Sequence, residues 1–145
     1  MSERAAGYRQ IDHTADLALE IWAPTEAELL ATGARALIEI LTDDNPPLGD
    51  SAREIVVDAV DAEDRLVQWL NEIIVAAIVE GFVFTGVDTI ELARGPATSA
   101  RLRASIRGQK DAGQRVVTEL KSVTYHDLTL TVTAERAECH VVIDV

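Results

Sequence analysis

Cysteine is almost absent from this 145-residue sequence, since Cys139 is the only one. A single cysteine excludes an internal disulfide framework and a zinc site built from several cysteines. It is typical of a small buried residue in a cytosolic protein. No apolar stretch follows Met1 to Arg4, so no signal peptide is predicted. The longest nearly uncharged apolar run, Ile73 to Val79, is far shorter than the roughly 20 residues that span a bilayer. We therefore expect a cytoplasmic protein.

Basic residues are also few: 13 Lys and Arg stand against 25 Asp and Glu, giving a net charge of −12. Such a chain is a poor general binder of the phosphate backbone, because nonspecific binding needs clustered Lys and Arg. The charge fits a soluble protein, a cation site, or a partner with a basic face. The content of 48% hydrophobic and 26% charged residues is ordinary for a globular protein. The length suits a single domain over residues 1–145.

Three signatures of catalysis are missing from the sequence. It has no glycine-rich phosphate loop, no Gly-x-Ser-x-Gly nucleophile elbow and no His-Glu-x-x-His pair. The surroundings of Cys139 match no known nucleophile signature either. These absences argue against the common nucleotide-binding, hydrolase and metalloprotease sites.

Two helices are predicted from hydrophobic spacing and from capping residues. The first covers residues 25–41, where Thr25 and Glu28 form a capping box before an apolar stripe at helical spacing. The second begins after Asp61, a helix-capping residue, and ends near Gly81, the residue type that most often follows a helix. Its last two turns are nearly all apolar, which predicts burial at the centre of the fold.

The remaining chain alternates between apolar and polar residues, as β-strands with one buried face do. The predicted strands cover residues 17–22, 53–60, 82–94, 100–107, 119–125, 128–134 and 138–145. Many of the links between them are too short for crossover connections, so most neighbours should be antiparallel. The sequence therefore predicts the α+β class, with two helices packed on a largely antiparallel or mixed β-sheet of about seven strands.

The first candidate site is the segment Asp12-His13-Thr14-Ala15-Asp16, which comes directly before a predicted strand. Two carboxylates and an imidazole within five residues can hold a cation or exchange protons. The alternative is a polar turn, in which Asp and Thr side chains bond to the nearby backbone.

The second candidate site is the end of the sequence, where Asp144 lies among apolar residues of the last strand. A carboxylate in an apolar strand is costly unless it is paired or bound to a metal. If the native chain ends here, the α-carboxylate of Val145 lies one residue away. Hard oxygen ligands of this kind suit calcium, magnesium or manganese rather than zinc. The alternative is a frayed, solvated terminus.

The third candidate site is the segment from Lys121 to Asp127, which links two predicted strands. It carries a cation, two hydroxyl groups, the His126 imidazole and a carboxylate. The alternative is a polar hairpin loop. His140 lies on the opposite strand face from its neighbour Cys139, so we expect a surface or structural role for it.

Arg101, Arg103 and Arg107 share one face of a predicted strand. We expect either a solvated sheet face or a docking patch for a phosphate or an acidic partner.

Four segments, in this order and spacing, resemble the archease family. They are the Asp12 to Asp16 segment, Trp69-Leu70-Asn71-Glu72 on the second helix, Lys121-Ser122-Val123-Thr124-Tyr125-His126, and Val142-Ile143-Asp144-Val145. Each motif alone is weak, but the four together extend over essentially the whole chain. Ser122 stands where alanine is frequent in the family. Asp127 stands where glycine is frequent, which puts the backbone of that loop in doubt because glycine adopts positive φ more readily.

The resemblance implies a non-catalytic accessory protein of the RtcB-type RNA ligase, which serves tRNA splicing and RNA repair. That ligase uses GTP and manganese to guanylylate its own histidine, and archease-like proteins promote this step and multiple turnover. The resemblance also implies a bound divalent cation, in the family often calcium, with manganese or magnesium as alternatives. Its implied ligands are Asp16, Asp144 and Val145.

The residues that could support this implied site are Asp12, His13, Lys121 and His126. The partners would be the ligase and, through it, RNA and GTP, without a membrane.

Two other functions remain open. One is a stand-alone metal-dependent hydrolase, in which Asp16 and Asp144 hold the ion and His126 is the base. The other is a general protein chaperone or a modulator of RNA methylation, roles that have also been suggested for archease-like proteins.

Overall fold

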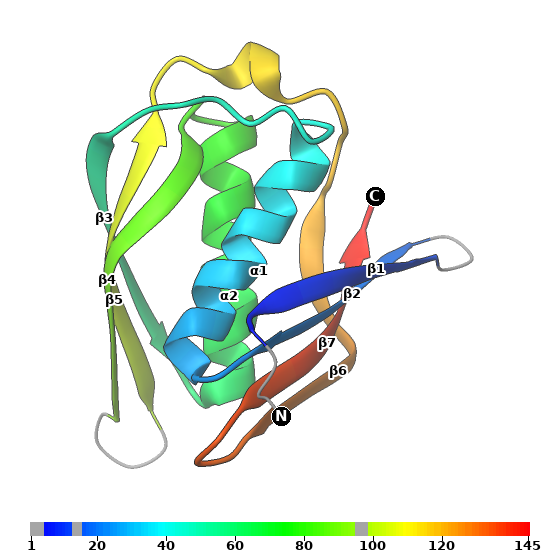
Figure 1. The fold of residues 1–145 in the computed structure, drawn as a ribbon, viewed down its shortest axis with the longest axis vertical. Helices are drawn as coiled ribbons and strands as arrows, with labels where there is room; N and C mark the ends of the chain where they lie inside the picture. Colours follow the sequence, from blue (N-terminus) through cyan, green and yellow to red (C-terminus); the bar gives the residue numbers. More distant parts are fainter. Residues whose placement is uncertain (1–4, 13–15, 95–98) are drawn as a thin grey trace.

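The computed structural model describes residues 5–12, 16–94 and 99–145, and it places two helices between two β-sheets (Figure 1). The elements in chain order are β1 Gly7–Asp12, β2 Leu17–Ala23, α1 Glu26–Leu41, β3 Ser51–Ala59, α2 Ala62–Ile78, β4 Val83–Arg94, β5 Ala100–Gln109, a 3-10 turn Gly113–Arg115, β6 Ser122–Val132 and β7 Ala137–Asp144. The predicted α+β class with two helices and seven strands is confirmed.

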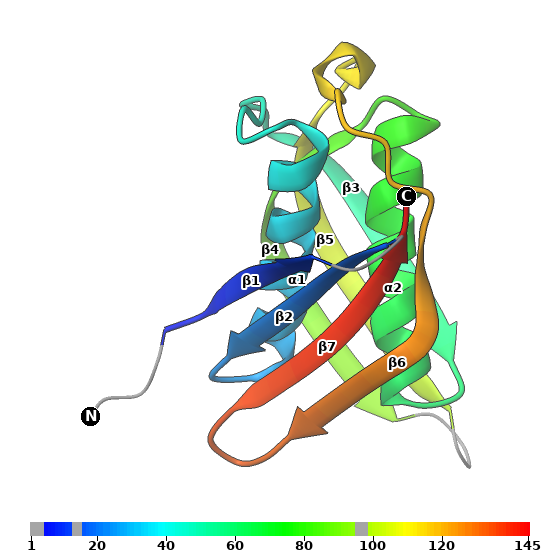
Figure 2. The same cartoon turned by 90° about the vertical axis from the view of Figure 1, so that its right-hand side faces the viewer.

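The seven strands are divided between two sheets, where the sequence predicted one. The four-stranded sheet has the order β1-β2-β7-β6 and the three-stranded sheet the order β3-β5-β4, and all described pairs are antiparallel. Figure 2 shows the four-stranded sheet in front of the helices, with β7 between β2 and β6. The helices thereby bury apolar residues on two opposite sides.

Two strand predictions are wrong: one strand was missed and one was predicted as two, so the predicted number of strands is still seven. The strand β1 was missed, because its residues from Gly7 to Asp12 carry few apolar side chains. The predicted strands 119–125 and 128–134 are one strand, β6. Thr124 lies opposite Val142 but Thr129 lies opposite His140, so four residues of β6 bulge out against one residue of β7.

Both helices begin and end as their capping residues predict. The hydroxyl of Thr25 accepts from the Glu28 N–H at 3.1 Å, and the carboxylate of Asp61 accepts from the Asp64 N–H at 2.8 Å. After α2, Gly81 adopts φ 71°, a left-handed conformation that glycine adopts without a steric penalty. Neither helix is long and apolar enough to cross a membrane, and no other helix of the described residues is.

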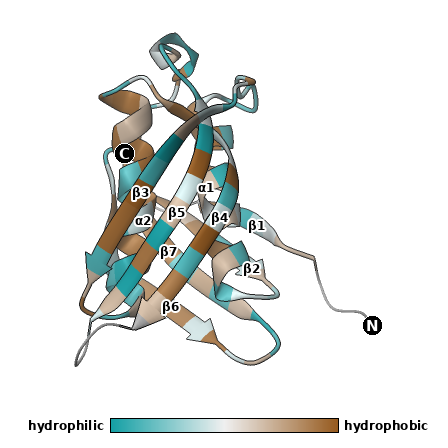
Figure 3. Cartoon of the chain, turned by 90° about the vertical axis from the view of Figure 1, so that its left-hand side faces the viewer, coloured by the Kyte–Doolittle hydropathy of each residue, from teal (hydrophilic) through white to brown (hydrophobic). Residues whose placement is uncertain are grey.

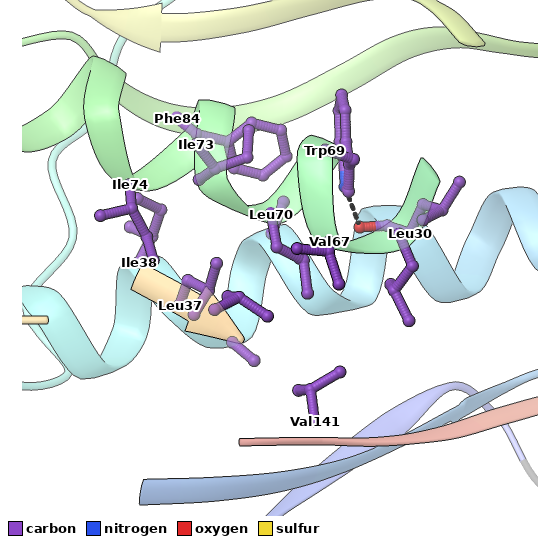
Figure 4. Packing of buried hydrophobic residues seen from close by; sticks show 14 of the residues in the cluster. Leu30, Leu37, Ile38, Val67, Trp69, Leu70, Ile73, Ile74, Phe84 and Val141 are labelled. Atoms are coloured by element: carbon purple, nitrogen blue, oxygen red, sulfur yellow. Dashed lines mark hydrogen bonds between the residues drawn. The ribbon is translucent and has the colours of Figure 1, made fainter. Parts of the chain in front are cut away.

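The core lies where the helices meet both sheets. Trp69 of α2 is completely buried, and its indole N–H donates to the Leu30 carbonyl of α1 at 2.8 Å (Figure 4). Val141 of β7 points toward the helices from the other side. Apolar and polar residues alternate along strands of the three-stranded sheet (Figure 3), so that one face is buried and the other is exposed. The alternation of β5 is as predicted, because Leu102 and Ile106 are buried while Arg101, Arg103 and Arg107 are exposed.

Candidate functional site

The main chain around Asp144 is held in the middle of the four-stranded sheet. Asp144 pairs with Ser122 of β6, and its carbonyl accepts from the Lys121 N–H at 2.8 Å. The preceding residue, Ile143, is fully buried, whereas Asp144 is exposed. The ladder therefore continues to Asp144, against the alternative of a frayed end. The apolar sequence before Asp144 is explained by contact with the helices.

The register of the β2–β7 pair indicates that Asp16, which directly precedes β2, lies across from Asp144. Leu17 of β2 pairs with Ile143 of β7, and the same register continued by one residue puts Asp16 opposite Asp144. Residues directly opposite each other in an antiparallel pair have Cβ atoms about 4.5–5.5 Å apart and share one face of the sheet. Because Ile143 faces the helices, this is the outer face. Two carboxylates that are 128 positions apart in the chain thus share one end of the sheet.

The start of β6 is clamped by α2. The Asn71 side chain accepts from the Val123 N–H at 2.7 Å and donates to the Val123 carbonyl at 3.1 Å. Both main-chain groups of one residue on an edge strand are thereby satisfied, which fixes the position of Lys121 two residues earlier. The lysine side chain is exposed, close to the end of β7. Asn71 belongs to one of the four sequence motifs, but no role was predicted for it, because nothing local indicates a main-chain partner 52 residues away.

The bulge of β6 extends from Tyr125 to Leu128, and Asp127 has φ 52°. Although Asp127 stands where glycine is frequent in the family, it adopts the left-handed backbone that glycine would favour. The carboxylate of Asp127 lies 3.2 Å from Nε2 of His126, and its carbonyl lies 3.1 Å from Nδ1 of His140. His140 is therefore a structural residue of the outer sheet face, as predicted.

At the other end of the bulge, the Tyr125 hydroxyl donates to the Asp64 carboxylate at the start of α2. This hydrogen bond raises the pKa of Tyr125 to about 12 and lowers the pKa of the Asp64 carboxyl. The bulge is thus tied to the helix through Tyr125 and to β7 through its contact with His140.

Cys139 does not belong to this site, and the structure does not test Asp12 and His13 as supporting residues. Cys139 is 5% exposed and faces the core, and burial raises the pKa of its thiol to about 12, which suits an inert residue. Asp12 is the last residue of β1, next in the sheet to β2, and nothing beyond its main chain is described. His13 lies outside the described residues, so its support of the site stays a prediction.

The arginine face of β5 is matched by carboxylates on the neighbouring strands. The guanidinium groups of Arg101 and Arg103 lie 3.7 Å from the carboxylates of Asp58 and Glu54 on β3. Arg107 pairs at 2.7 Å with Asp88 of β4. Because these exposed pairs neutralise the positive charge, the geometry favours a solvated sheet face over an anion-docking patch.

The donors at the end of the sheet fit a hard divalent cation. Two aspartate carboxylates and the main-chain oxygens of Val145 are oxygen ligands, which calcium, magnesium and manganese prefer. Among the described residues no three His, Cys, Asp or Glu side chains gather around one point. Asp16, Asp144 and Val145 alone would leave coordination positions for water or for groups from a partner.

A hollow of 410 Å³ lies farther along the sheet and is separate from these donors. Trp22, Thr131, Glu138 and His140 are among its lining residues, whereas Asp16, Asp144 and His126 are not. A stand-alone hydrolase would need a substrate cavity at the carboxylates, so this hollow gives that alternative no support.

Comparison with known protein families shows to which family the chain belongs. The model of the archease protein family matches residues 8–145, which is nearly the whole sequence. The chain belongs to the archease family. The protein archease of Methanosarcina barkeri is 33% identical over 149 aligned residues and covers all of both chains. The protein archease of Methanopyrus kandleri is 32% identical over 123 residues, which are 83% of this chain and 86% of the relative.

Solved structures agree with the archease fold. An archease from Thermotoga maritima, described as a possible chaperone, superposes with a TM-score of 0.59 at 25% identity and covers 94% of this chain and 96% of its own. The solution structure of Methanobacterium thermoautotrophicum protein 1598 gives a TM-score of 0.76 at 20% identity, with coverage of 96% and 99%. The second similarity concerns the fold alone.

Proposed function

We propose that this archease is a non-catalytic accessory protein of an RtcB-type RNA ligase, and that it promotes GTP-dependent guanylylation and turnover in tRNA splicing or RNA repair. In this proposal Asp16, Asp144 and Val145 hold a divalent cation, with calcium, manganese and magnesium as candidates. The observation that supports the proposal is the pairing of Leu17 with Ile143, because the same register continued by one residue puts Asp16 opposite Asp144, whose carbonyl accepts from the Lys121 N–H.

The protein's own residues have separate tasks in this proposal. A bound cation would supply positive charge to phosphate oxygens and orient the groups around them. Asp16 directly precedes β2 and Asp144 ends β7, and the pairing of these two strands would hold the carboxylates near each other. Lys121 presents a compact ammonium group, which suits a phosphate oxygen. The clamp between Asn71 and Val123 keeps this lysine at the end of β7.

The net charge indicates where the site acts. An acidic chain with −12 charges binds RNA weakly on its own, because the phosphate backbone repels it. Guanylylation of a histidine develops charge on phosphate oxygens, which cations stabilise. We therefore infer that the acidic site acts at the ligase and meets RNA and GTP only through it.

The test is a time course of ligase guanylylation with limiting amounts of the accessory protein. Asp16→Asn and Lys121→Ala should each abolish the stimulation while their thermal melts match that of the unchanged protein. Asp58→Asn and Arg103→Ala are matched controls at exposed positions of the three-stranded sheet, and both should stimulate fully. Calcium titration by calorimetry should show binding that Asp16→Asn removes and that Lys121→Ala leaves in place.

The alternatives predict other outcomes. Full stimulation by Asp16→Asn and Lys121→Ala would refute the proposed mechanism. Hydrolysis of phosphoesters by the isolated protein would favour the hydrolase. Suppressed aggregation of unrelated unfolded proteins, without any effect on guanylylation, would favour the general chaperone.

A further inference from the structure

The hollow of 410 Å³ lies on the outer face of the four-stranded sheet, the face turned toward the viewer in Figure 2. Ile21 and Cys139 are buried against the helices, so their neighbours along β2 and β7 point outward. Two adjacent rows across the sheet supply most of the lining, namely Trp22, Glu138 and Thr131 in one row and Arg9, Glu20 and His140 in the next. The volume is within the range of about 300–1,000 Å³ that is typical of small-molecule sites.

The indole of Trp22 forms one side of this hollow. Gly7 of β1 lies directly opposite Trp22, and a Cβ atom on Gly7 would lie only 3.0 Å from Cζ2 of the ring. The ring therefore occupies the space that a side chain on β1 would need. Trp22 is half-buried and still lines the hollow. An aromatic ring in this position offers a flat ligand a surface on which to stack.

His140 contributes a hydrogen-bond acceptor. Its Nδ1 lies 3.1 Å from the carbonyl oxygen of Asp127, and a carbonyl can only accept. Nδ1 therefore carries the hydrogen, and in the neutral imidazole Nε2 is the acceptor. The bulge of β6 thus fixes which nitrogen of His140 is available to a ligand.

The charges of the hollow are matched within the protein. Arg9 pairs with Glu20 across the strands, and Arg136 pairs with Glu138 at 3.2 Å. Among the described residues both contacts use Oε1, which leaves Oε2 of each carboxylate to accept from a ligand. A free anion or cation would find no unmatched charge here, so the hollow favours a neutral polar ligand.

We propose that this hollow binds a guanine base. The base is flat and neutral, and it can stack on Trp22. Its O6 and N7 atoms accept hydrogen bonds, for which an arginine such as Arg9 is the usual partner. Its N1–H and N2–H₂ groups donate, and Glu20, Glu138 and His140 accept. Guanine has more N–H donors than adenine, cytosine or uracil, so it fits best a hollow in which accepting side chains outnumber the donating one.

The base can come from a free nucleotide or from an unpaired position of an RNA strand, whose base edges are open to hydrogen bonding. The net charge of −12 weighs against ligands with many phosphates, so the base itself has to supply the affinity. This inference goes beyond the proposed function. Its test contains no ligase, so either can fail without the other.

The test is a titration with guanosine, adenosine, cytidine and uridine, followed by tryptophan fluorescence. A stacked base should quench Trp22, whereas Trp69, the other tryptophan, is completely buried and should not respond. We expect saturable quenching by guanosine, with an affinity about tenfold or more above those of the other three nucleosides. Glu20→Gln should weaken guanosine binding about tenfold, because it removes a hydrogen bond to a charged group. Glu54→Gln is the matched control and should change nothing, since Glu54 also faces an arginine on the neighbouring strand.

A ligand variant keeps the test decisive if Glu20→Gln lowers the melting temperature. In 1-methylguanosine a methyl group replaces the N1 hydrogen, and its binding to the unchanged protein should be about tenfold weaker than that of guanosine. Tighter binding of GTP than of a short single-stranded RNA ending in guanosine would support a free nucleotide as the source of the base, and the reverse order would support RNA. Equal affinities for all four nucleosides and 1-methylguanosine, or no quenching by guanosine, would overturn the proposal.

Discussion

The Asp127→Gly variant should be more stable than the Asp127→Ala variant, which is the reverse of the order expected at an ordinary strand position. Asp127 has φ 52° in the bulge of β6, a conformation that costs a residue with a Cβ atom about 1–2 kcal/mol. Both substitutions remove the carboxylate beside His126, so that loss is common to the two variants. Their difference therefore reports on the backbone alone. This cost, less the roughly 0.5–1 kcal/mol that glycine loses through its larger entropy in the unfolded chain, leaves the glycine variant more stable than the alanine variant by up to about 1 kcal/mol.

The size of the effect is measurable for a chain of this length. At about 2.1 cal/mol/K per residue, 145 residues give an unfolding entropy of about 0.3 kcal/mol/K. A difference of about 1 kcal/mol then corresponds to about 3 °C in melting temperature. At a position with negative φ the order reverses, because glycine loses about 0.5–1 kcal/mol relative to alanine through its larger entropy in the unfolded chain.

Urea denaturation at equilibrium, followed by far-ultraviolet circular dichroism, is the suitable assay. The control is the same pair of substitutions at Glu91, an exposed residue of β4, where alanine should be the more stable. An Asp127→Ala variant as stable as Asp127→Gly, or more stable, would refute the left-handed backbone at this position.

Three further predictions concern buried charge, ionisation and the end of β7. Glu26→Ala should destabilise the fold by about 3–5 kcal/mol in denaturant titrations, because it leaves the buried Arg65 guanidinium without its ion-pair partner at 2.9 Å; a loss under 1 kcal/mol would contradict this. Burial and a hydrogen bond to a carboxylate raise the pKa of Tyr8 to about 12, and chiefly such a hydrogen bond does the same for Tyr125. Absorbance at 295 nm should therefore show no tyrosinate in the folded protein at pH 10. The stability that the two protonated tyrosines contribute below pH 10 should be lost as the pH rises toward 12, because the unfolded state releases these protons at lower pH than the folded state does. A tyrosinate signal with a midpoint at pH 10 would contradict the raised pKa values. An extension beyond Val145 should weaken calcium binding and ligase stimulation, whereas an N-terminal tag should not, and equal activity of both tagged forms would count against Val145 as a ligand.

The sequence predicted those features whose causes are local. The helix boundaries followed from Thr25, Asp61 and Gly81, each of which acts on main-chain groups within a few residues. The alternation in β5 gave its buried face directly, because successive side chains of a strand point to opposite sides.

Features that depend on distant partners could not be predicted in the same way. The division into two sheets depends on which strands pair, and β2 finds its partner β7 more than a hundred residues later. The polar run from Tyr125 to Asp127 has the composition of a turn, and only the pairing of β6 with β7 on either side of it shows that it is a bulge. The facing positions of Asp16 and Asp144 likewise follow from the register, which no local pattern contains.

The place of β7 between β2 and β6 has a consequence for biosynthesis. The ribosome makes β2 and β6 before β7, so until β7 emerges both nascent strands expose unsatisfied main-chain groups toward the gap. The helices and the three-stranded sheet can form earlier, because α1, α2, β3, β4 and β5 all precede β6 in the chain. A product truncated before Ala137 would keep that half but carry two open strand edges and no Asp144. Its failure mode is edge-to-edge aggregation.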